Sequence, residues 1–184
     1  MDALQNARKP AATEAATPPV RVYRRGGKAV LWLKAEMLHL TAISDFLKDW
    51  LHAQEEYRGN PDQVYRVELA VIEACTNVIR HGGSTAADSW LCVSLRRRGQ
   101  AAEIHILDRG RAFDPTQAPA PNLLEPGEGG YGIYLIKQLM TGLEYERRGA
   151  RWNCLRLRHL IPPPAGRRTG GRPHPRPGGA RKAG

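Results

Sequence analysis

The stretch VELAVIEACTNVIRHGG, which ends at Gly83, constrains the fold of this chain more than any other segment. Its apolar residues recur with the period of a helix that packs into a core. Glu73, Asn77 and His81 follow one another at intervals of four residues, so they form one row on the helix surface. A buried ionised carboxylate is costly unless it is paired or functional, whereas an exposed polar row is an ordinary solvent face. The row therefore indicates either a functional site or a solvent-facing stripe.

The first two members of the row have the chemistry of a nucleotide site. The amide carbonyl of Asn77 is a hard oxygen ligand of the kind that suits Mg²⁺. The carboxylate of Glu73, one turn earlier, can orient or deprotonate a hydroxyl nucleophile. His81 comes where the helix ends, and we interpret it as a helix-end polar residue without a catalytic role.

The segment ILDRGRAFDP places Asp108 at the end of an apolar strand, with Gly110 two residues later. A carboxylate in this position can accept a hydrogen bond from an exocyclic amine such as that of adenine. Glycine lets the backbone approach a flat ring. Aspartate and glycine are also ordinary turn residues, so the motif by itself is equally compatible with a plain turn.

The segment GEGGYGIYLI carries four glycines immediately before and inside the start of a helix. Free N–H groups at a helix N-terminus bind phosphate. The pattern is neither a Walker loop nor a dinucleotide fingerprint, because no GK[ST] follows it and it does not follow a strand at the start of the chain. A flexible hinge is the alternative interpretation. The four glycines are Gly127, Gly129, Gly130 and Gly132.

Hydrophobic periodicity predicts one α+β domain over residues 20–161. Short or alternating apolar runs predict strands, and a period near 3.6 predicts helices. The second helix has a start signal at Asn60 and Pro61, and Gly82 or Gly83 can end it in the left-handed conformation. The expected elements are a strand at 28–35, a helix at 36–54, a helix ending at 81, strands at 89–98 and 102–110, a long loop at 111–130, a helix at 131–143 and a strand at 151–160. An antiparallel sheet with helices on one face accommodates this order.

The two ends of the chain have the composition of disordered segments. Residues 1–19 are rich in Ala, Thr and Pro and predict a disordered leader. Residues 162–184 are rich in Pro, Gly and Arg, with six cationic side chains and no acid, and predict a disordered tail. The tail supplies most of the net charge of +10. Because charge alone specifies no partner, we favour a solvated tail over an arm for nucleic acid or an acidic partner.

The cysteines and the hydropathy favour a cytoplasmic protein. Cys75, Cys92 and Cys154 are isolated in apolar runs, which is typical of small core residues rather than of a disulfide or a metal site. No apolar run approaches the roughly 20 residues that a bilayer span needs, and the first residues lack the apolar core of a signal peptide.

The three motifs, taken in their order, resemble the histidine-kinase-like ATPase superfamily with the GHKL or Bergerat fold. Within it, the chain resembles the bacterial anti-sigma-factor serine kinases. ELAVIEACTNVIRHGG resembles their N box, LDRGRAFDP their first glycine box and EGGYGIYLIKQLM their second, and the resemblance extends over about residues 28–160. It implies a two-layer α/β sandwich in which helices cover one face of a mixed, mostly antiparallel sheet.

The resemblance also implies a role for each motif residue. Glu73 matches the general base, Asn77 the Mg²⁺ ligand, Asp108 the carboxylate that contacts adenine, and Gly110 the glycine beside the ring. The glycines of the second box belong to the loop that closes on the phosphates of ATP and to the lid that precedes it. These are Gly130 and Gly132 for the loop, and Gly127 and Gly129 for a lid spanning 116–129.

The function implied is that of an ATP- and Mg²⁺-dependent serine/threonine protein kinase that acts as an anti-sigma factor. Its partners would be a sigma factor and a STAS-type anti-anti-sigma protein, which it would phosphorylate on serine. A homodimer is implied, and direct binding of nucleic acid is not expected. Thr141, Trp152 and Ala112 stand where the family usually has Asp, Gly and, in other branches, Gly. These departures leave partner choice and catalytic rate open.

Two other classes of function remain. A nucleotide-binding interaction module would sequester a regulatory partner with little or no kinase activity. A histidine kinase fragment would need a phosphoacceptor histidine on a dimerisation helix. His39 and His52 are the upstream candidates, but neither is followed by the acid-x-x-Pro pattern. We therefore favour the serine kinase, with the interaction module as the alternative.

Overall fold

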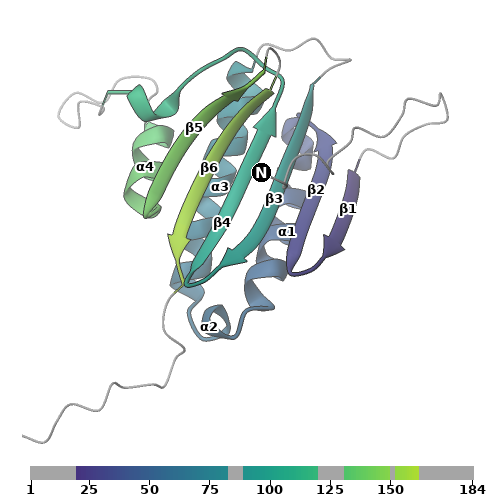
Figure 1. The fold of residues 1–184 in the computed structure, drawn as a ribbon, viewed down its shortest axis with the longest axis vertical. Coiled ribbons are helices and arrows are strands. Elements are labelled where there is room, and N and C mark those ends of the chain that lie inside the picture. The colour runs from purple at the N-terminus through teal and green to yellow at the C-terminus, as the bar shows by residue number, and fades with distance from the viewer. Residues whose placement is uncertain (1–19, 83–88, 120–130, 150–151, 162–184) are drawn as a thin grey trace, which may run out of the picture.

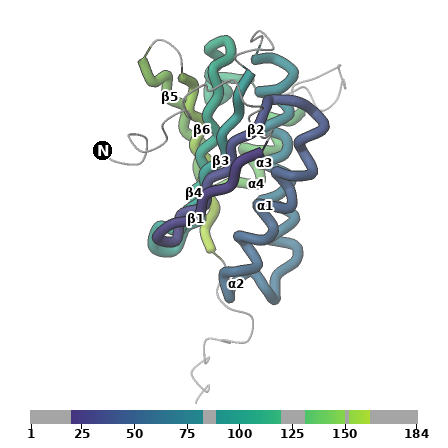
Figure 2. The backbone as a smooth tube through the Cα atoms, turned by 90° about the vertical axis from the view of Figure 1, so that its right-hand side faces the viewer, coloured from purple at the N-terminus to yellow at the C-terminus, as the bar shows by residue number. Residues whose placement is uncertain are grey.

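The computed structural model describes residues 20–82, 89–119, 131–149 and 152–161, which form a six-stranded sheet covered on one face by helices (Figures 1 and 2). The strands are β1 (Val20–Arg25), β2 (Lys28–Lys34), β3 (Trp90–Arg98), β4 (Ala101–Asp108), β5 (Gly142–Arg148) and β6 (Trp152–Leu160). The helices are α1 (Leu40–His52), α2 (Glu55–Arg58), α3 (Pro61–His81) and α4 (Tyr131–Leu139). Short 3₁₀ turns cover Met37–His39 and Pro115–Gln117. The predicted two-layer α+β fold is confirmed. The predicted leader and tail lie outside the described residues.

The strand order is β1-β2-β3-β4-β6-β5, and all five pairings are antiparallel. Four of the five join strands that follow one another in the order of strands along the chain: three are hairpins, and β2 and β3 are connected through the helices α1, α2 and α3. The pairing of β4 with β6 is the exception, because α4 and β5 lie between these strands in the chain. This pairing sets Asp108 directly opposite Asn153.

The core lies between the sheet and the helices α1 and α3. Apolar side chains at helical spacing on α1 are fully or almost fully buried against it: Ile43, Phe46, Leu47, Trp50 and Leu51. The sheet contributes alternate residues of its strands to the same core, among them Leu31, Leu33, Ile104, Ile106 and Leu157. α3 buries its own apolar side chains in the same core, among them Val67, Ala70 and Val71, so it is held against the sheet beside α1. No helix within the described ranges is long and apolar enough to cross a bilayer.

The short helix α2 is tied to the last strand. The hydroxyl of Tyr57 is hydrogen-bonded to Nδ1 of His159 at 2.8 Å, and both side chains are buried. The predicted start of α3 is confirmed, with Asn60 as its N-cap and Pro61 in its first turn. The side chain of Asn60 does not cap that helix but donates to the carbonyl of Glu56 at 2.7 Å.

Two strands were not predicted, and two helices are shorter than predicted: the helix predicted over 36–54 is a 3₁₀ turn at Met37–His39 followed by α1 over Leu40–His52. β1 and β5 are the two edge strands, and most of their side chains are half-buried or exposed, so their hydrophobic signal is weak. The helix predicted over 131–143 ends at Leu139, and Gly142 already begins β5. The strand predicted over 102–110 ends at Asp108, since Arg109 and Gly110 have left the sheet.

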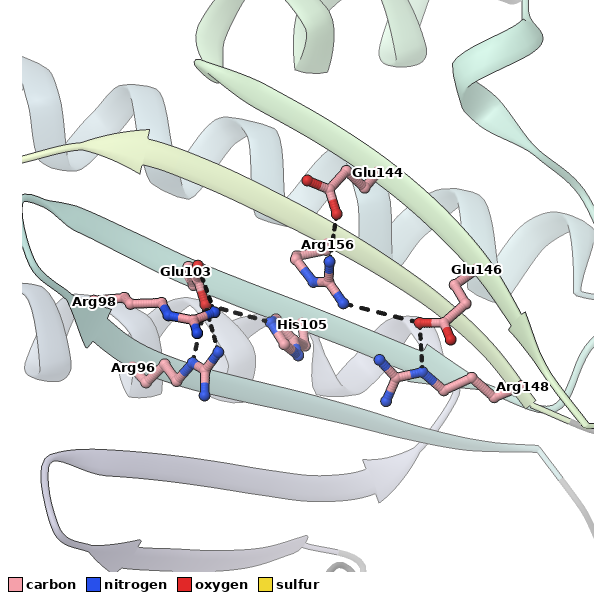
Figure 3. A network of polar contacts seen from close by, with 8 residues as sticks. All are labelled: Arg96, Arg98, Glu103, His105, Glu144, Glu146, Arg148 and Arg156. Atoms are coloured by element: carbon pink, nitrogen blue, oxygen red, sulfur yellow. Dashed lines mark hydrogen bonds and ion pairs between the residues drawn. The ribbon is translucent and has the colours of Figure 1, made fainter. Parts of the chain in front are cut away.

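The face of the sheet away from the helices carries an apolar half and a charged half. Trp32, Cys92, Leu107 and Cys154 form a small buried cluster there, with Trp152 packed beside it. The charged half is a network of arginines and glutamates around His105 (Figure 3). Its ion pairs join Arg96 and Arg98 to Glu103, Arg156 to Glu144 and Glu146, and Arg148 to Glu146.

His105 is a buried imidazole inside this cationic network. Its Nε2 atom is buried and forms no hydrogen bond within the described residues, and Oε2 of Glu103 lies 3.9 Å away. Burial, together with the charges of Arg156 and Arg96, lowers the pKa of His105 to about 4. The folded protein therefore keeps this imidazole neutral at neutral pH.

His105 should make the stability of the protein depend on pH. The unfolded chain takes up the proton near pH 6.5 and the folded protein near pH 4. Below pH 6.5 the unfolded state thus binds more protons, and the free energy of unfolding falls as the pH falls. Urea unfolding should show the wild type losing about 2–3 kcal/mol relative to His105→Gln between neutral pH and pH 4. His81→Gln, at an exposed histidine, serves as the control, and a His105→Gln curve parallel to the wild-type curve would contradict this account.

Candidate functional site

The polar row on α3 faces the start of α4. The side chains of Glu73 and Asn77 are half-buried, and Gly132 in the first turn of α4 lies directly against them. A Cβ atom at Gly132 would lie 2.7 Å from Oε2 of Glu73 and 3.5 Å from Nδ2 of Asn77. The first distance is shorter than van der Waals contact, so any larger residue at 132 would have to displace the carboxylate.

No hydrogen bond or ion pair engages Glu73 or Asn77 within the described parts of the chain. The neighbouring acid on the same helix is different. Glu68 accepts a hydrogen bond from Ser44 and lies 3.1 Å from Nζ of Lys48, so it links α3 to α1. A half-buried carboxylate without a partner is a candidate for a functional role. Glu73 therefore differs from Glu68 in its surroundings as well as in its place in the row.

The C-terminal end of α3 is in backbone contact with the loop that follows β4. A Cβ atom at Gly110 would lie 2.5 Å from the carbonyl oxygen of Gly82 and 2.6 Å from its Cα. The N–H of Arg111 donates to the same carbonyl oxygen at 2.6 Å. Gly82 has right-handed helical dihedrals, so of the two predicted positions it is not the left-handed one. The other predicted position, Gly83, lies outside the described residues.

Asp108 ends β4, as predicted, and its side chain is held by two donors. The N–H of Gly110 and Nδ2 of Asn153 each donate to Oδ1 at 2.7 Å. Burial raises the pKa of Asp108, and the two hydrogen bonds and the charge of Arg147 oppose that rise. Oδ2 accepts no hydrogen bond from the described residues, so it is the oxygen that a ligand could engage.

Asn153 is the site residue that the motifs did not indicate. It is 4 % exposed, and besides Asp108 it donates to the carbonyl oxygens of Gly110 and Arg111. Its own oxygen accepts hydrogen bonds from Tyr145 and Arg147, both on β5. The signal that could have found it is the alternation of β6, which turns every second residue from Asn153 toward the helices.

The remaining predicted residues are less closely tied to this arrangement. His81 is exposed at the last position of α3, as the helix-end interpretation predicted. The first residues of the predicted lid are bound to α4, because Nζ of Lys137 donates to the carbonyl oxygens of Thr116 and Ala118 at 3.0 and 2.9 Å. The rest of the lid lies outside the described residues, and so do Gly127, Gly129 and Gly130.

The oxygen atoms that the site residues offer suit a nucleotide that carries a divalent ion. Most ligands of such an ion come from the nucleotide and few from the protein. The described residues contain no group of three or more His, Cys, Asp or Glu side chains that could hold a metal. Mg²⁺ is commonly bound by one or two protein oxygens together with substrate phosphates. Oδ1 of Asn77 can be such an oxygen, and the space left by Gly132 lies beside it. The residues present therefore fit ATP and Mg²⁺.

The fold and these motifs define a nucleotide-binding domain with an antiparallel sheet. A family model identifies the family of nucleotide-binding domains to which it belongs. Residues 33–159 match the histidine kinase-like ATPase domain, and the chain belongs to that family. It is 30% identical over 132 residues to the serine/threonine-protein kinase BtrW of Bordetella bronchiseptica, covering 67% of this chain and 92% of that protein. It is 28% identical over 120 residues to the serine-protein kinase RsbW of Bacillus subtilis, covering 53% of this chain and 75% of that protein. A crystal structure of RsbU and RsbW domains from Mycobacterium tuberculosis aligns with 72% of this chain and 32% of its own, at a TM-score of 0.49 and 16% identity.

Replacing Gly110 by alanine should destabilise the domain by about 1–3 kcal/mol, because the added methyl group meets backbone atoms of Gly82 that cannot move without shifting α3. Chemical unfolding measures this loss. Gly142→Ala is the control, since its Cβ would lie 3.3 Å from the side chain of exposed Arg158 and not against backbone. Equal stability of Gly110→Ala and the wild type would show that the end of α3 and the loop after β4 separate easily.

Proposed function

We propose that this chain is an ATP-dependent serine/threonine protein kinase that regulates transcription by partner switching. The observation that carries the proposal is Glu73: a half-buried carboxylate without a partner in the described residues, one helical turn from Asn77 and against the glycine of α4. Membership of the histidine kinase-like ATPase family supports ATP as the phosphoryl donor. The similarity to proteins named serine kinases supports serine as the acceptor.

The proposed mechanism assigns one task to each element of the site. Asp108 accepts a hydrogen bond from the amino group of adenine, while Gly110 leaves room for the ring. Asn77 offers an oxygen to Mg²⁺, which when bound neutralises charge on the phosphates. Glu73 accepts the proton of the seryl hydroxyl while the seryl oxygen forms a bond to the γ-phosphorus of ATP. The bond that joined this phosphorus to ADP breaks, and ADP leaves. The first turn of α4 directs its N–H groups toward the phosphates.

The partners follow from the same proposal. The kinase would hold a sigma factor in one state and a STAS-type protein in the other. Phosphorylation of the STAS protein on serine would prevent it from competing, and the sigma factor would stay bound. We include a homodimer in this proposal, in line with the expectation from the sequence. The cytoplasm is the compartment in which these partners meet.

Replacement of Glu73 by glutamine tests the catalytic assignment. The amide keeps the shape of the side chain but cannot take the proton, so phosphoryl transfer should fall by about 100-fold or more while ATP still binds. Transfer is measured with radiolabelled ATP and a cognate STAS protein, and binding by calorimetry. Asp62→Asn is the matched control, because Asp62 lies at the exposed opposite end of the same helix.

Three results are distinguishable. Transfer lost in Glu73→Gln and kept in Asp62→Asn supports the assignment. Transfer unchanged in both variants would show that another group takes the proton. Nucleotide binding without transfer in the wild type would favour the alternative function, an interaction module that sequesters its partner.

A further inference from the structure

The orientation of the Asn153 amide follows from its neighbours. Two donors, the hydroxyl of Tyr145 and Nη1 of Arg147, point at one end of the amide at 2.8 and 2.6 Å, so that end is the oxygen. Three acceptors surround the other end, which is therefore the nitrogen. A flipped amide would set its NH₂ group against the guanidinium of Arg147, which can only donate, and its oxygen against three acceptors.

This orientation decides what Asp108 can offer a ligand. With the Asn153 amide and the N–H of Gly110 both donating to Oδ1, the carboxylate cannot rotate without losing two hydrogen bonds. Oδ2 remains as an acceptor. The positive charge of Arg147, which also donates to the carbonyl oxygen of Gly110 at 3.3 Å, favours the ionised carboxylate.

We propose that Asn153, oriented by Tyr145 and Arg147, determines base specificity by holding Asp108 as a fixed acceptor for the 6-amino group of a purine. The inference rests on the proposed function, because it takes the ligand of Asp108 to be a purine nucleotide. Asn153 touches Asp108 and acts through it, so it is a positioning residue. The edge strand β5 thereby takes part in nucleotide selection although none of its residues belongs to the three motifs.

The chemistry of the two purine classes makes this a selective arrangement. A 6-amino purine donates a hydrogen bond to a carboxylate oxygen. A 6-oxo purine presents an acceptor oxygen at the same position, so the hydrogen bond is lost and two oxygens face each other. A site built to hydrogen-bond a donor discriminates strongly against analogues that lack it, because its own buried group is left unpaired. A protonated Asp108 would have the opposite preference.

Substitution of Asn153 by aspartate changes one donor into an acceptor with almost no change of shape. Two carboxyl groups would then face each other across β4 and β6, and they would share a proton. When the proton of the pair lies on Oδ2 of Asp108, that oxygen can donate a hydrogen bond to a 6-oxo base. Arg147→Gln is a second variant, on an exposed edge-strand side chain, that weakens the same arrangement without altering Asn153.

The experiment is calorimetric titration of the full chain with Mg²⁺ and either ADP or inosine diphosphate. The readout is the ratio of the two dissociation constants, which does not depend on the fraction of active protein in a preparation. The wild type should prefer ADP by about 10- to 100-fold, as expected for a hydrogen bond to a charged group. Asn153→Asp should reduce that ratio by about 10-fold or more, and Arg147→Gln by about 3-fold or more. Arg148→Gln, on the next residue of β5 but on the opposite face of the sheet, should leave it unchanged.

The outcomes separate this inference from the proposed function. A wild type that binds ADP selectively, together with Asn153→Asp and Arg147→Gln variants that keep the wild-type ratio, would overturn the role of Asn153 and leave the proposed function standing. Equal binding of ADP and inosine diphosphate by the wild type would also overturn the role of Asn153. A wild type that binds neither nucleotide would overturn the proposed function and this inference together.

Discussion

The close approach of Gly82 to Gly110 is the contact on which the site depends. It joins the end of the central helix to the loop after β4 through backbone atoms, without side chains between them. Because the two segments are in contact at this point, the polar row on α3 and the carboxylate that ends β4 belong to one region of the molecule. A larger residue at 110 would hold these two parts of the candidate site apart.

The parts of the fold that the sequence predicted correctly are those with a strong local signal. The apolar period of α3 and the Asn-Pro start at residue 60 predict that helix without knowledge of its neighbours. The strand before Asp108 is buried along its whole length, and its apolar residues Ile104, Ile106 and Leu107 give the strand signal although Glu103 and His105 lie among them. The missed strands β1 and β5 are edge strands rich in arginine, and charged, half-exposed edges are a known way to prevent unwanted pairing. Each pairs with the next strand in the chain, so it is their polar composition that hides them from a search for apolar runs.

In the candidate site, too, the residues with a local sequence signal were predicted and those whose role depends on distant partners were not. Glu73 and Asn77 could be paired from their spacing alone, since four residues make one helical turn. A glycine at a helix end suggests a left-handed residue, whereas Gly82 is right-handed and its lack of a side chain permits contact with another segment. Asn153 was missed because its role comes from register. It faces Asp108 across two strands that are far apart in the chain, and a single sequence contains no record of that pairing.

The strand order also has a consequence for how the protein folds. Three of the hairpins, β1–β2, β3–β4 and β5–β6, join neighbouring strands and close short loops, which makes them early-forming units. The β4–β6 pairing must instead close a loop that includes α4 and β5, at a higher entropic cost. The hydrogen bond from Asn153 to Asp108 spans that loop. A ribosome-bound chain that has emerged only as far as β4 can therefore form the central helix and its polar row, but it acquires the support of Asp108 only once the last strand has been released.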